Sequence, residues 1–326
     1  MNNLKKIGLT ALAASLVSTS VFAGEVTVAG SASMTVEGYT GTDQDAGKGF
    51  SMGNQLTFTG GGELDNGLTV AISFVLDQGD NETDTTAGAG TAPFDSHSVS
   101  ISSDALGKVT LHGEGGSSAQ AALDTTAAGD VWDTFDNAGL TTGVKVKSSS
   151  ANGDTLVYAL PTMMDDLAIS ASYSPQEATA SSATAYAATY TGVEGLSVSY
   201  GKGEVTTAAD GSNADATTMK ASYAIGSFTL AYSDNDYATD VADNDQETTS
   251  YKVSYTVSDD ISVSYGHEEI DEESEALDAE FENLSVSYTS GGMTLTANRS
   301  ESTDGAHSSG TADDRDYWSL GLAFAF

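Results

Sequence analysis

Carboxylates are the side chains of this sequence that are most able to do chemistry. Residues 234–247 carry a close succession of them, Asp234, Asp236, Asp240, Asp243 and Asp245. Oxygen ligands at that density suit hard divalent cations such as Ca²⁺ and Mg²⁺. No segment has the central Gly and terminal Glu of a complete calcium-binding loop. We therefore expect loose binding of such ions to acidic loops, and we predict no defined metal site and no cofactor.

Catalytic groupings are weak in this chain. The histidines, His97, His112, His267 and His307, lie in separate segments, and no HExxH, GxSxG or phosphate-loop pattern occurs. The sequence has no cysteine, which excludes thiol nucleophiles and cysteine-ligated metals. We predict that the protein is not an enzyme.

The charge balance limits the partners. The 326 residues include 11 basic and 47 acidic side chains, a formal net charge of −36. Nucleic acid is not an expected partner, because phosphate binding needs clustered Lys and Arg. The acidity has two interpretations: it keeps chains soluble and apart, or it concentrates cations near the protein. The positions of the acids must decide between them.

Residues 1–23 have the features of a secretory signal peptide. Lys5 and Lys6 precede an apolar run over residues 7–17, and residues 21–23 form a small-residue cleavage pattern. We expect cleavage to leave residues 24–326 as a single domain. The apolar run is too short for a transmembrane helix, which needs about 20 apolar residues, and no later stretch approaches that length. A membrane location would therefore have to come from strands.

The elements that position the charged side chains are predicted to be strands, in which large apolar residues recur at every second position. Segments 167–173, 196–200, 228–232 and 261–265 alternate large apolar residues with Ser, Thr, Ala or Gly. This alternation is typical of a membrane-spanning strand with lipid on one face and water on the other. Unpaired backbone groups cost several kcal/mol each in hydrocarbon, so such strands must close into a barrel.

The alternating segments predict sixteen strands, an even number that brings both chain ends to one side. The predicted strands span residues 25–39, 50–64, 67–77, 95–103, 108–114, 154–161, 167–175, 183–191, 196–204, 216–225, 227–234, 247–257, 261–268, 278–289, 292–300 and 315–326. Tight turns alternate with longer acidic loops at 78–94, 205–215, 234–247, 268–277 and 301–314. Residues 141–149 could form a further strand, but the odd total would be unsuitable, so we place them in a loop. The predicted fold is an all-β, transmembrane, antiparallel β-barrel.

The carboxyl-terminal strand has the clearest apolar stripe, and the chain ends on an aromatic residue. Its large side chains are Tyr317, Trp318, Leu320, Leu322, Phe324 and Phe326.

Together these features resemble the general porins of the Gram-negative outer membrane, which are sixteen-stranded trimers. Residues 317–326 are similar to the family's barrel-assembly signal. Residues 106–114 resemble the strand that leads into the family's third loop, and residues 154–161 resemble the strand that leaves it. The resemblance implies outer-membrane lipids, further copies of the chain in a homotrimer and the barrel-assembly machinery as partners.

In that family the third loop folds into the lumen and narrows it, and the matching segment here is residues 115–153. Trp132 and Phe135 give this segment an apolar anchor. The resemblance implies that its acids line the pore constriction; they are Asp124, Asp130, Asp133 and Asp136. The same aspartates could instead be turn-forming or helix-capping residues without influence on the pore.

The sequence departs from the family at the wall opposite this loop, where porins usually have arginines. Glu114 stands where the family often has Arg, and the two arginines, Arg299 and Arg315, lie near predicted outer loops. The bases nearest the constriction in sequence are His112, Lys145 and Lys147, joined by Lys220 and Lys252 at positions of water-facing parity. Lys145 and Lys147 either form a reduced basic patch or are ordinary solvated loop lysines.

We predict a passive diffusion channel for small hydrophilic solutes and ions. Cations should be preferred, because rings of acids attract them. Two other classes remain open at this point. A structural or adhesive surface barrel would have the same stripes but a plugged, non-conducting interior, and a secreted soluble β-sandwich would need no detergent.

Overall fold

The computed structural model describes residues 26–40, 47–77, 95–136, 144–150, 154–176, 181–207, 212–307 and 314–326. The predicted signal peptide, residues 1–23, lies outside this part of the chain. Within it, sixteen strands follow one another, and two short helices lie between the fifth and sixth strands. None of the helices in the described residues has the length and apolarity needed to cross a membrane.

The strands are β1 (Thr27–Thr40), β2 (Gly47–Glu63), β3 (Thr69–Asp77), β4 (Ser96–Ser103), β5 (Gly107–Glu114), β6 (Thr155–Ala159), β7 (Leu167–Ser174), β8 (Ser182–Val193), β9 (Leu196–Thr206), β10 (Asn213–Ile225), β11 (Phe228–Thr239), β12 (Gln246–Ser258), β13 (Ile261–Glu272), β14 (Ala279–Ser290), β15 (Met293–Thr303) and β16 (Arg315–Ala325). The helices are the 3-10 helix η1 (Ala121–Leu123) and the α-helix α2 (Asp133–Asp136).

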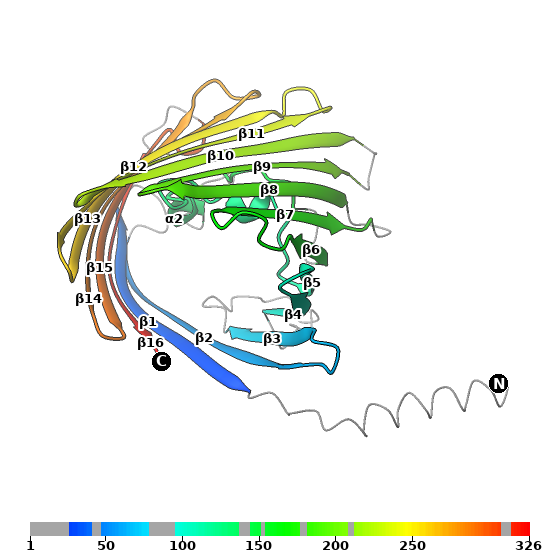
Figure 1. Ribbon diagram of the computed structural model, residues 1–326. Coiled ribbons are helices and arrows are strands. Elements are labelled where there is room, and N and C mark those ends of the chain that lie inside the picture. The colour runs from blue at the N-terminus through cyan, green and yellow to red at the C-terminus, as the bar shows by residue number, and fades with distance from the viewer. Residues whose placement is uncertain are drawn as a thin grey trace, which may run out of the picture.

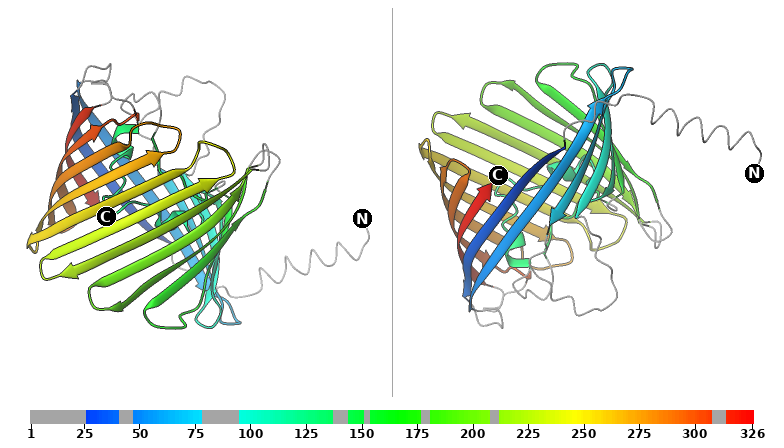
Figure 2. Two further views of the ribbon diagram at one scale, coloured as in Figure 1. Left: turned by 90° about the horizontal axis from the view of Figure 1, so that it is seen from above. Right: turned by 90° about the horizontal axis from the view of Figure 1, so that it is seen from below.

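The strands form one closed antiparallel barrel. Each strand pairs with its neighbours in sequence, and β1 pairs with β16 to complete the ring. Figure 1 shows this ring with α2 drawn inside it, and Figure 2 shows the inclined strands from two further sides. Ser31, near the start of β1, pairs with Ala325, the last residue of β16, so the first and last strands have these two ends on the same side of the barrel. The predicted sixteen-stranded antiparallel barrel is confirmed.

Each predicted strand coincides with an observed one, but several strands run further than predicted. β11 continues to Thr239 and β13 to Glu272, so the predicted loops at 234–247 and 268–277 are wrong over those residues. Backbone pairing continues past the end of the apolar stripe, where charged residues take the outward positions. Residues 144–149, the described part of the ambiguous stretch, form no strand.

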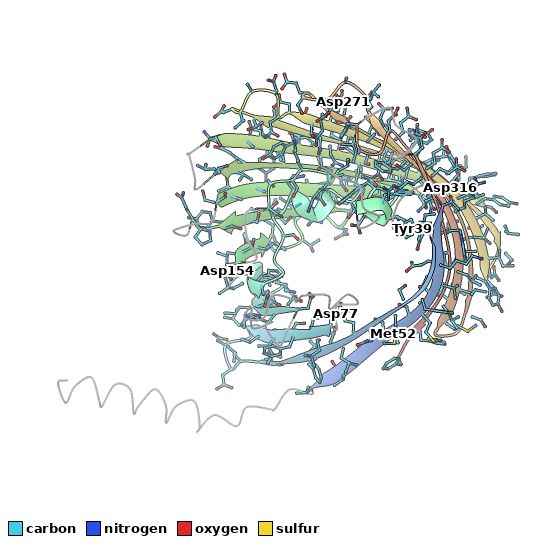
Figure 3. The ribbon with its side chains drawn as sticks, turned by 180° about the vertical axis from the view of Figure 1, so that it is seen from behind. Tyr39, Met52, Asp77, Asp154, Asp271 and Asp316 are labelled. Carbon is cyan, nitrogen blue, oxygen red and sulfur yellow. The ribbon has the colours of Figure 1, made fainter. Side chains whose placement is uncertain are left out.

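The two faces of the barrel wall differ as the alternation predicts. One face exposes large apolar side chains such as Tyr223, Leu230 and Val253. The other face, called the inner face below, carries mainly Ser, Thr, Ala and Gly and is contacted by the segment that contains α2. Figure 3, in which Tyr39 and Met52 are labelled, shows side chains on both faces.

The last residue completes the seam between β1 and β16. The Phe326 N–H donates to the carbonyl oxygen of Gly30 at 2.9 Å, and the Gly30 N–H donates back to Phe326 at 2.7 Å. The Phe326 ring lies directly over Gly30, because a Cβ at that position would stand 2.5 Å from the ring. The terminal aromatic therefore belongs to the closing strand pair.

Candidate functional site

The segment between β5 and β6 lies against the inner face of the barrel. Its described residues, 115–136 and 144–150, are called the wall-bound loop below. The Ala119 N–H donates to Ser172 Oγ of β7 at 2.8 Å. Gln120 donates through Nε2 to Thr218 Oγ1 of β10 at 2.8 Å and accepts through Oε1 from the Ser149 N–H at 2.8 Å. Gln120 thus ties both limbs of the loop to the wall.

One row of directly paired inner-face residues holds the middle of the loop. This anchor row crosses β10 to β14 and consists of Lys220, Ser233, Ser250, Glu268 and Phe281. The loop backbone meets the row in chain order. The Lys220 ammonium donates to the Thr125 carbonyl oxygen, Ser233 Oγ accepts from the Ala127 N–H at 2.8 Å, and Ser250 Oγ accepts from the Ala128 N–H at 2.9 Å. Successive backbone groups of the loop therefore bond to side chains of successive strands.

Glu268 is the most heavily bonded member of the anchor row. Its side chain is 0 % exposed and accepts from Thr126 Oγ1 at 2.7 Å, from the Val131 N–H at 3.1 Å and from the Trp132 N–H at 3.2 Å. The sequence prediction placed this residue at the junction of the strand 261–268 and the acidic loop 268–277, and gave it no role. Its inward parity within the extended β13 is the signal that could have found it.

An apolar cluster holds the end of the described first limb. Phe135 is 0 % exposed, and its ring centroid lies 5.8 Å from that of Phe281. Val131, Ile270 and Ala279 are buried in the same cluster, and Trp132 packs against it. Trp132 and Phe135 therefore do provide the apolar anchor that the sequence indicates.

The four predicted acids differ in their surroundings. Asp124 and Asp130 are half-buried, and both interact electrostatically with Lys220. Burial, followed by the repulsion from Asp130, raises the pKa of Asp124 to about 6. Asp130 has a positive φ of 54° and accepts from the Thr126 N–H at 2.8 Å. Asp133 is exposed on α2, and Asp136 is the last residue of that helix.

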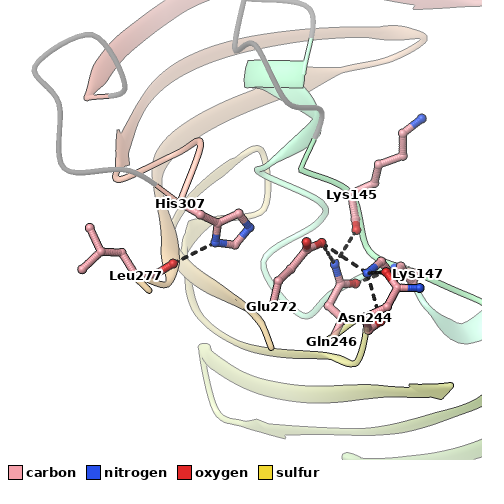
Figure 4. Close-up of polar contacts among 7 residues, drawn as sticks. All are labelled: Lys145, Lys147, Asn244, Gln246, Glu272, Leu277 and His307. Carbon is pink, nitrogen blue, oxygen red and sulfur yellow. Dashed lines mark hydrogen bonds and ion pairs between the residues drawn. The ribbon is translucent and has the colours of Figure 1, made fainter. Parts of the chain in front are cut away.

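Lys147 forms an ion pair with Glu272, and the side chain of Lys145 points away from that contact (Figure 4). Its Nζ lies 3.5 Å from Glu272 Oε1 and donates to the carbonyl oxygen of Asn244 at 3.2 Å. Gln246 accepts from the Lys147 N–H at 2.7 Å and donates to the Lys145 carbonyl oxygen at 2.9 Å. Lys145 exposes its own side chain. This network fixes the returning limb of the loop to β12 and β13.

Of the remaining predicted bases, Lys252 on β12 donates to the Ala128 carbonyl oxygen of the loop at 3.4 Å, and the others lie on β5, β15 and β16. His112 is on the inner face of β5, between Ser98 and Thr155, and Glu114 ends the same strand opposite His97. Arg299 points outward and pairs with Glu301 and Asp316, whereas Arg315 is buried on the inner face. No arginine therefore stands opposite the loop among the described residues.

The wall across from most of the loop is formed by β1 to β4. At the end of β1 the Tyr39 hydroxyl reaches the loop and donates to the Thr134 carbonyl oxygen at 2.9 Å. Among the described inner-face positions of these strands the charged residues are Glu37, Glu63 and Asp77, and none is Lys or Arg. The rest are mainly Ser, Thr and Gly, as in the pairs Ser33 with Gly53 and Ala71 with Ser100. The described inner-face side chains of this wall are therefore mainly small and polar, and none is Lys or Arg.

Comparison with known proteins identifies the family. Residues 8–289 match the model of the Gram-negative porins. The chain belongs to that porin family. No curated protein sequence matches it closely enough to count as a relative.

Solved structures agree with the barrel. An anion-selective porin from Comamonas acidovorans is 18% identical to this porin, with a TM-score of 0.64, covering 93% of this chain and 100% of its own. A loop L8 deletion mutant of OmpT, an outer membrane protein of Vibrio cholerae, is 15% identical with a TM-score of 0.67 and the same coverage. A porin refined at 1.8 Å resolution is 19% identical with a TM-score of 0.64. Identities this low show the shared fold alone. Family and fold together imply a passive channel in the outer membrane.

Many acids of this porin face away from its interior. An outer acidic belt occupies outward positions at the loop ends of β11 to β16; it consists of Asp234, Asp236, Glu247, Glu269, Asp271, Glu280, Glu282, Glu301 and Asp316. On the inner faces of the same strands the described acids are Glu268 and Glu272. The described residues contain no group of three or more His, Asp or Glu that could hold a metal ion.

Proposed function

We propose that this porin is an open channel through which small hydrophilic solutes and ions pass down their gradients, with cations preferred. A sixteen-stranded barrel is wide enough for an aqueous channel, whereas an eight-stranded barrel is filled by side chains. We also propose that the wall-bound loop lies in the lumen and sets its narrowest section. Its hydrogen bonds along β7 to β14 support this position.

The absence of bases from the described wall across from the loop carries the proposed cation preference. Asp124, Asp130 and Asp133 lie on the loop side of the lumen. The two inner-face lysines nearest them both donate to loop carbonyl oxygens, Lys220 to Thr125 and Lys252 to Ala128. Rings of acids favour cations in channels. The Comamonas porin is named for anion selectivity, and at 18% identity that likeness concerns the fold.

Reversal potentials in a KCl gradient test the preference. Replacing Asp130, Asp133 and Asp136 together by Asn should reduce the permeability ratio of K⁺ to Cl⁻. Asn suits position 130 because, like Asp, it tolerates the positive φ found there. The matched control replaces Asp271, Glu280 and Glu282 of the outer acidic belt by their amides, which should change the ratio much less. Charges beyond a Debye length of roughly 8 Å are largely screened at physiological salt.

Three results would contradict parts of this proposal. Anion preference in the unmodified porin would refute the cation preference. Equal effects of the two triple variants would refute the local origin of selectivity. Absence of single-channel current from correctly folded barrels would favour the structural or adhesive surface barrel instead.

We further propose a homotrimer in the outer membrane that packs through the side formed by β1 to β5. The outward positions there lack the outer acidic belt, and Phe50 and Met52 are 89 % and 60 % exposed. Within this side β3, β4 and β5 have at most 9 residues, whereas β8 to β15 have at least 11, so the wall is low at these three strands, next to the longer β1 and β2 with 14 and 17 residues. Met52→Asn should weaken the trimer in mild detergent. Met219→Asn, at an outward methionine that is 51 % exposed on β10, should leave it intact. Equal trimer stability in both variants would contradict this interface.

The proposed route to the membrane is export through the signal peptide of residues 1–23, followed by recognition of the terminal strand by the barrel-assembly machinery. The exposure of Phe326, 73 %, supports such recognition at the seam of β1 and β16.

Loose divalent binding remains a proposal for the outer acidic belt. Asp236, Glu247 and Asp271 are directly paired across β11 to β13, and like charges in that position destabilise a sheet. Millimolar Mg²⁺ or Ca²⁺ should therefore raise the temperature at which the folded barrel unfolds by more than NaCl of equal ionic strength does. Equal effects of the two salts would contradict the proposal.

A further inference from the structure

A polar cavity of about 330 Å³ lies between the wall-bound loop and the inner faces of β12 to β16. Gly129, Val131 and Thr134 line it on the loop side. Its volume is at the lower end of the roughly 300–1,000 Å³ that is typical of small-molecule sites. The cavity is therefore suited to a small solute.

Two neighbouring rows of paired wall residues build the far side of this cavity. One row is Lys252, Gly266, Asn283, Ser300 and Tyr317, and the next is Ser285, Asn298 and Ser319. Gly266 leaves a gap in the first row that the loop fills, because a Cβ there would stand 2.9 Å from Ala128 Cβ. The loop thus closes one end of the cavity, where Asn283 and Asn298 are half-buried and Ser300 and Ser319 are buried beneath them.

Lys252 is the sole charged residue among the described residues that line the cavity. Its ammonium group donates to the Ala128 carbonyl oxygen at a long 3.4 Å. An ammonium group has three donors, so Lys252 can also serve a bound group. Among the described lining residues there is no carboxylate, although the chain carries 47 acids; Glu37 lies behind the lining residue Tyr317 and accepts from its hydroxyl at 2.7 Å. A lysine in such surroundings favours an anionic group, and a carboxylate forms the stronger, charge-assisted hydrogen bond with it.

The neutral groups of the cavity suit hydroxyls. Asn283 donates through Nδ2 to Ser300 Oγ at 2.8 Å, and Asn298 donates in the same way to Ser319 Oγ at 3.2 Å. In each pair the half-buried Asn retains an amide oxygen that can accept and a second N–H that can donate. Two such pairs on adjacent strands present alternating acceptors and donors, which is the pattern that neighbouring hydroxyls of a polyol can satisfy.

We propose that this cavity is a binding subsite for a small polyhydroxylated solute with one carboxylate, a sugar acid, whose carboxylate meets Lys252 and whose hydroxyls meet the Asn–Ser pairs. Its role in solute passage rests on the proposed channel function. The binding itself is independent of conduction and can be measured in detergent.

Isothermal titration of the detergent-folded porin with gluconate tests the subsite, with acetate and sorbitol as comparison solutes. Gluconate should bind saturably and more tightly than either comparison solute. Lys252→Gln should weaken gluconate by about tenfold or more, because it removes the charge-assisted contact. Asn283→Ala should weaken gluconate without changing acetate. Lys108→Gln, at an inner-face lysine of β5 outside the cavity, should leave gluconate binding unchanged.

Bilayer recordings separate the failure of this subsite from failure of the channel. Gluconate should reduce the K⁺ current of the unmodified porin and have less effect on Lys252→Gln. Normal current without saturable gluconate binding would overturn the subsite alone, as would equal affinity in the unmodified porin and Lys252→Gln. Gluconate binding that depends on Lys252 in a barrel without current would support the subsite and refute the channel. Unchanged heat-dependent gel mobility establishes that each variant is folded.

Discussion

Removal of the Glu268 carboxylate should release the wall-bound loop and change the current through the barrel. Glu268 is fully buried and accepts three hydrogen bonds, from Thr126 Oγ1, the Val131 N–H and the Trp132 N–H, at 2.7, 3.1 and 3.2 Å. These contacts join β13 to the part of the loop that enters α2. Glu268→Ala would leave all three donors without this acceptor.

The size of the effect follows from these contacts. A hydrogen bond contributes about 0.5–1.5 kcal/mol, and a buried donor left unpaired costs about 1–3 kcal/mol. The desolvation of the buried carboxylate offsets part of this gain, and water from the interior can reach freed donors. We therefore expect Glu268→Ala to destabilise the bound position of the loop by about 3 kcal/mol. At about 1.4 kcal/mol per tenfold, that is roughly a hundredfold rise in the ratio of released to bound loop.

Single-channel recording measures this release. Glu268→Ala should show greater open-channel noise and a second conductance level, whereas Glu268→Gln should be intermediate, because its amide oxygen can still accept from the backbone. Glu269→Ala is the matched control, since the neighbouring carboxylate lies on the outward face of the same strand. Identical conductance and noise in Glu268→Ala and the unmodified porin, with both barrels folded by gel mobility, would refute the reasoning.

Three further outcomes follow from other parts of the barrel. The pKa of Asp124 is raised to about 6, so acidification from pH 7.5 to 5 should protonate this carboxylate and lower the K⁺ preference. Asp124→Asn should show a smaller pH dependence of the reversal potential than the unmodified porin. The same pH dependence in both proteins would contradict the titration of Asp124 as its cause. Deletion of Phe326, or Gly30→Val, should reduce the fraction of folded barrel in refolding assays because both disturb the ring that covers Gly30, and full yield from both variants would argue against that contact. Lys147→Met should lower the thermal stability only slightly, because a partly exposed ion pair contributes about 0.2–1 kcal/mol; a loss of several kcal/mol in unfolding measurements would contradict this.

The fold was predictable because lipid on one face and water on the other impose a two-residue period on every strand. That period located all sixteen strands, including the closing strand that ends at Phe326. It failed at strand ends such as Asp234 to Thr239 of β11, because outward positions beyond the apolar stripe carry acids, which in sequence are typical of loops. Backbone pairing, unlike apolarity, continues there.

The candidate site was less predictable, because its contacts join residues far apart in sequence. The four loop aspartates came from resemblance, and alternation alone places Lys220 and Lys252 on the inner face. No local pattern indicates that Glu268 meets the loop 137 residues earlier at Val131. The register of β10 to β14 brings the anchor row together, and register between strands cannot be read from a stripe.

Net charge is a poor guide to the field inside this barrel, because strand parity decides which acids face the solute. On β11 to β16 the outer acidic belt takes the outward positions, while the described inner faces of the same strands hold Glu268 and Glu272 as their acids. One of these accepts three hydrogen bonds from the loop and the other pairs with Lys147. The belt lies on the outward side of the barrel wall, and exposed charges separated by more than a Debye length of roughly 8 Å are largely screened. We therefore expect a few side chains of the loop to determine the interior potential more than the total of −36 does.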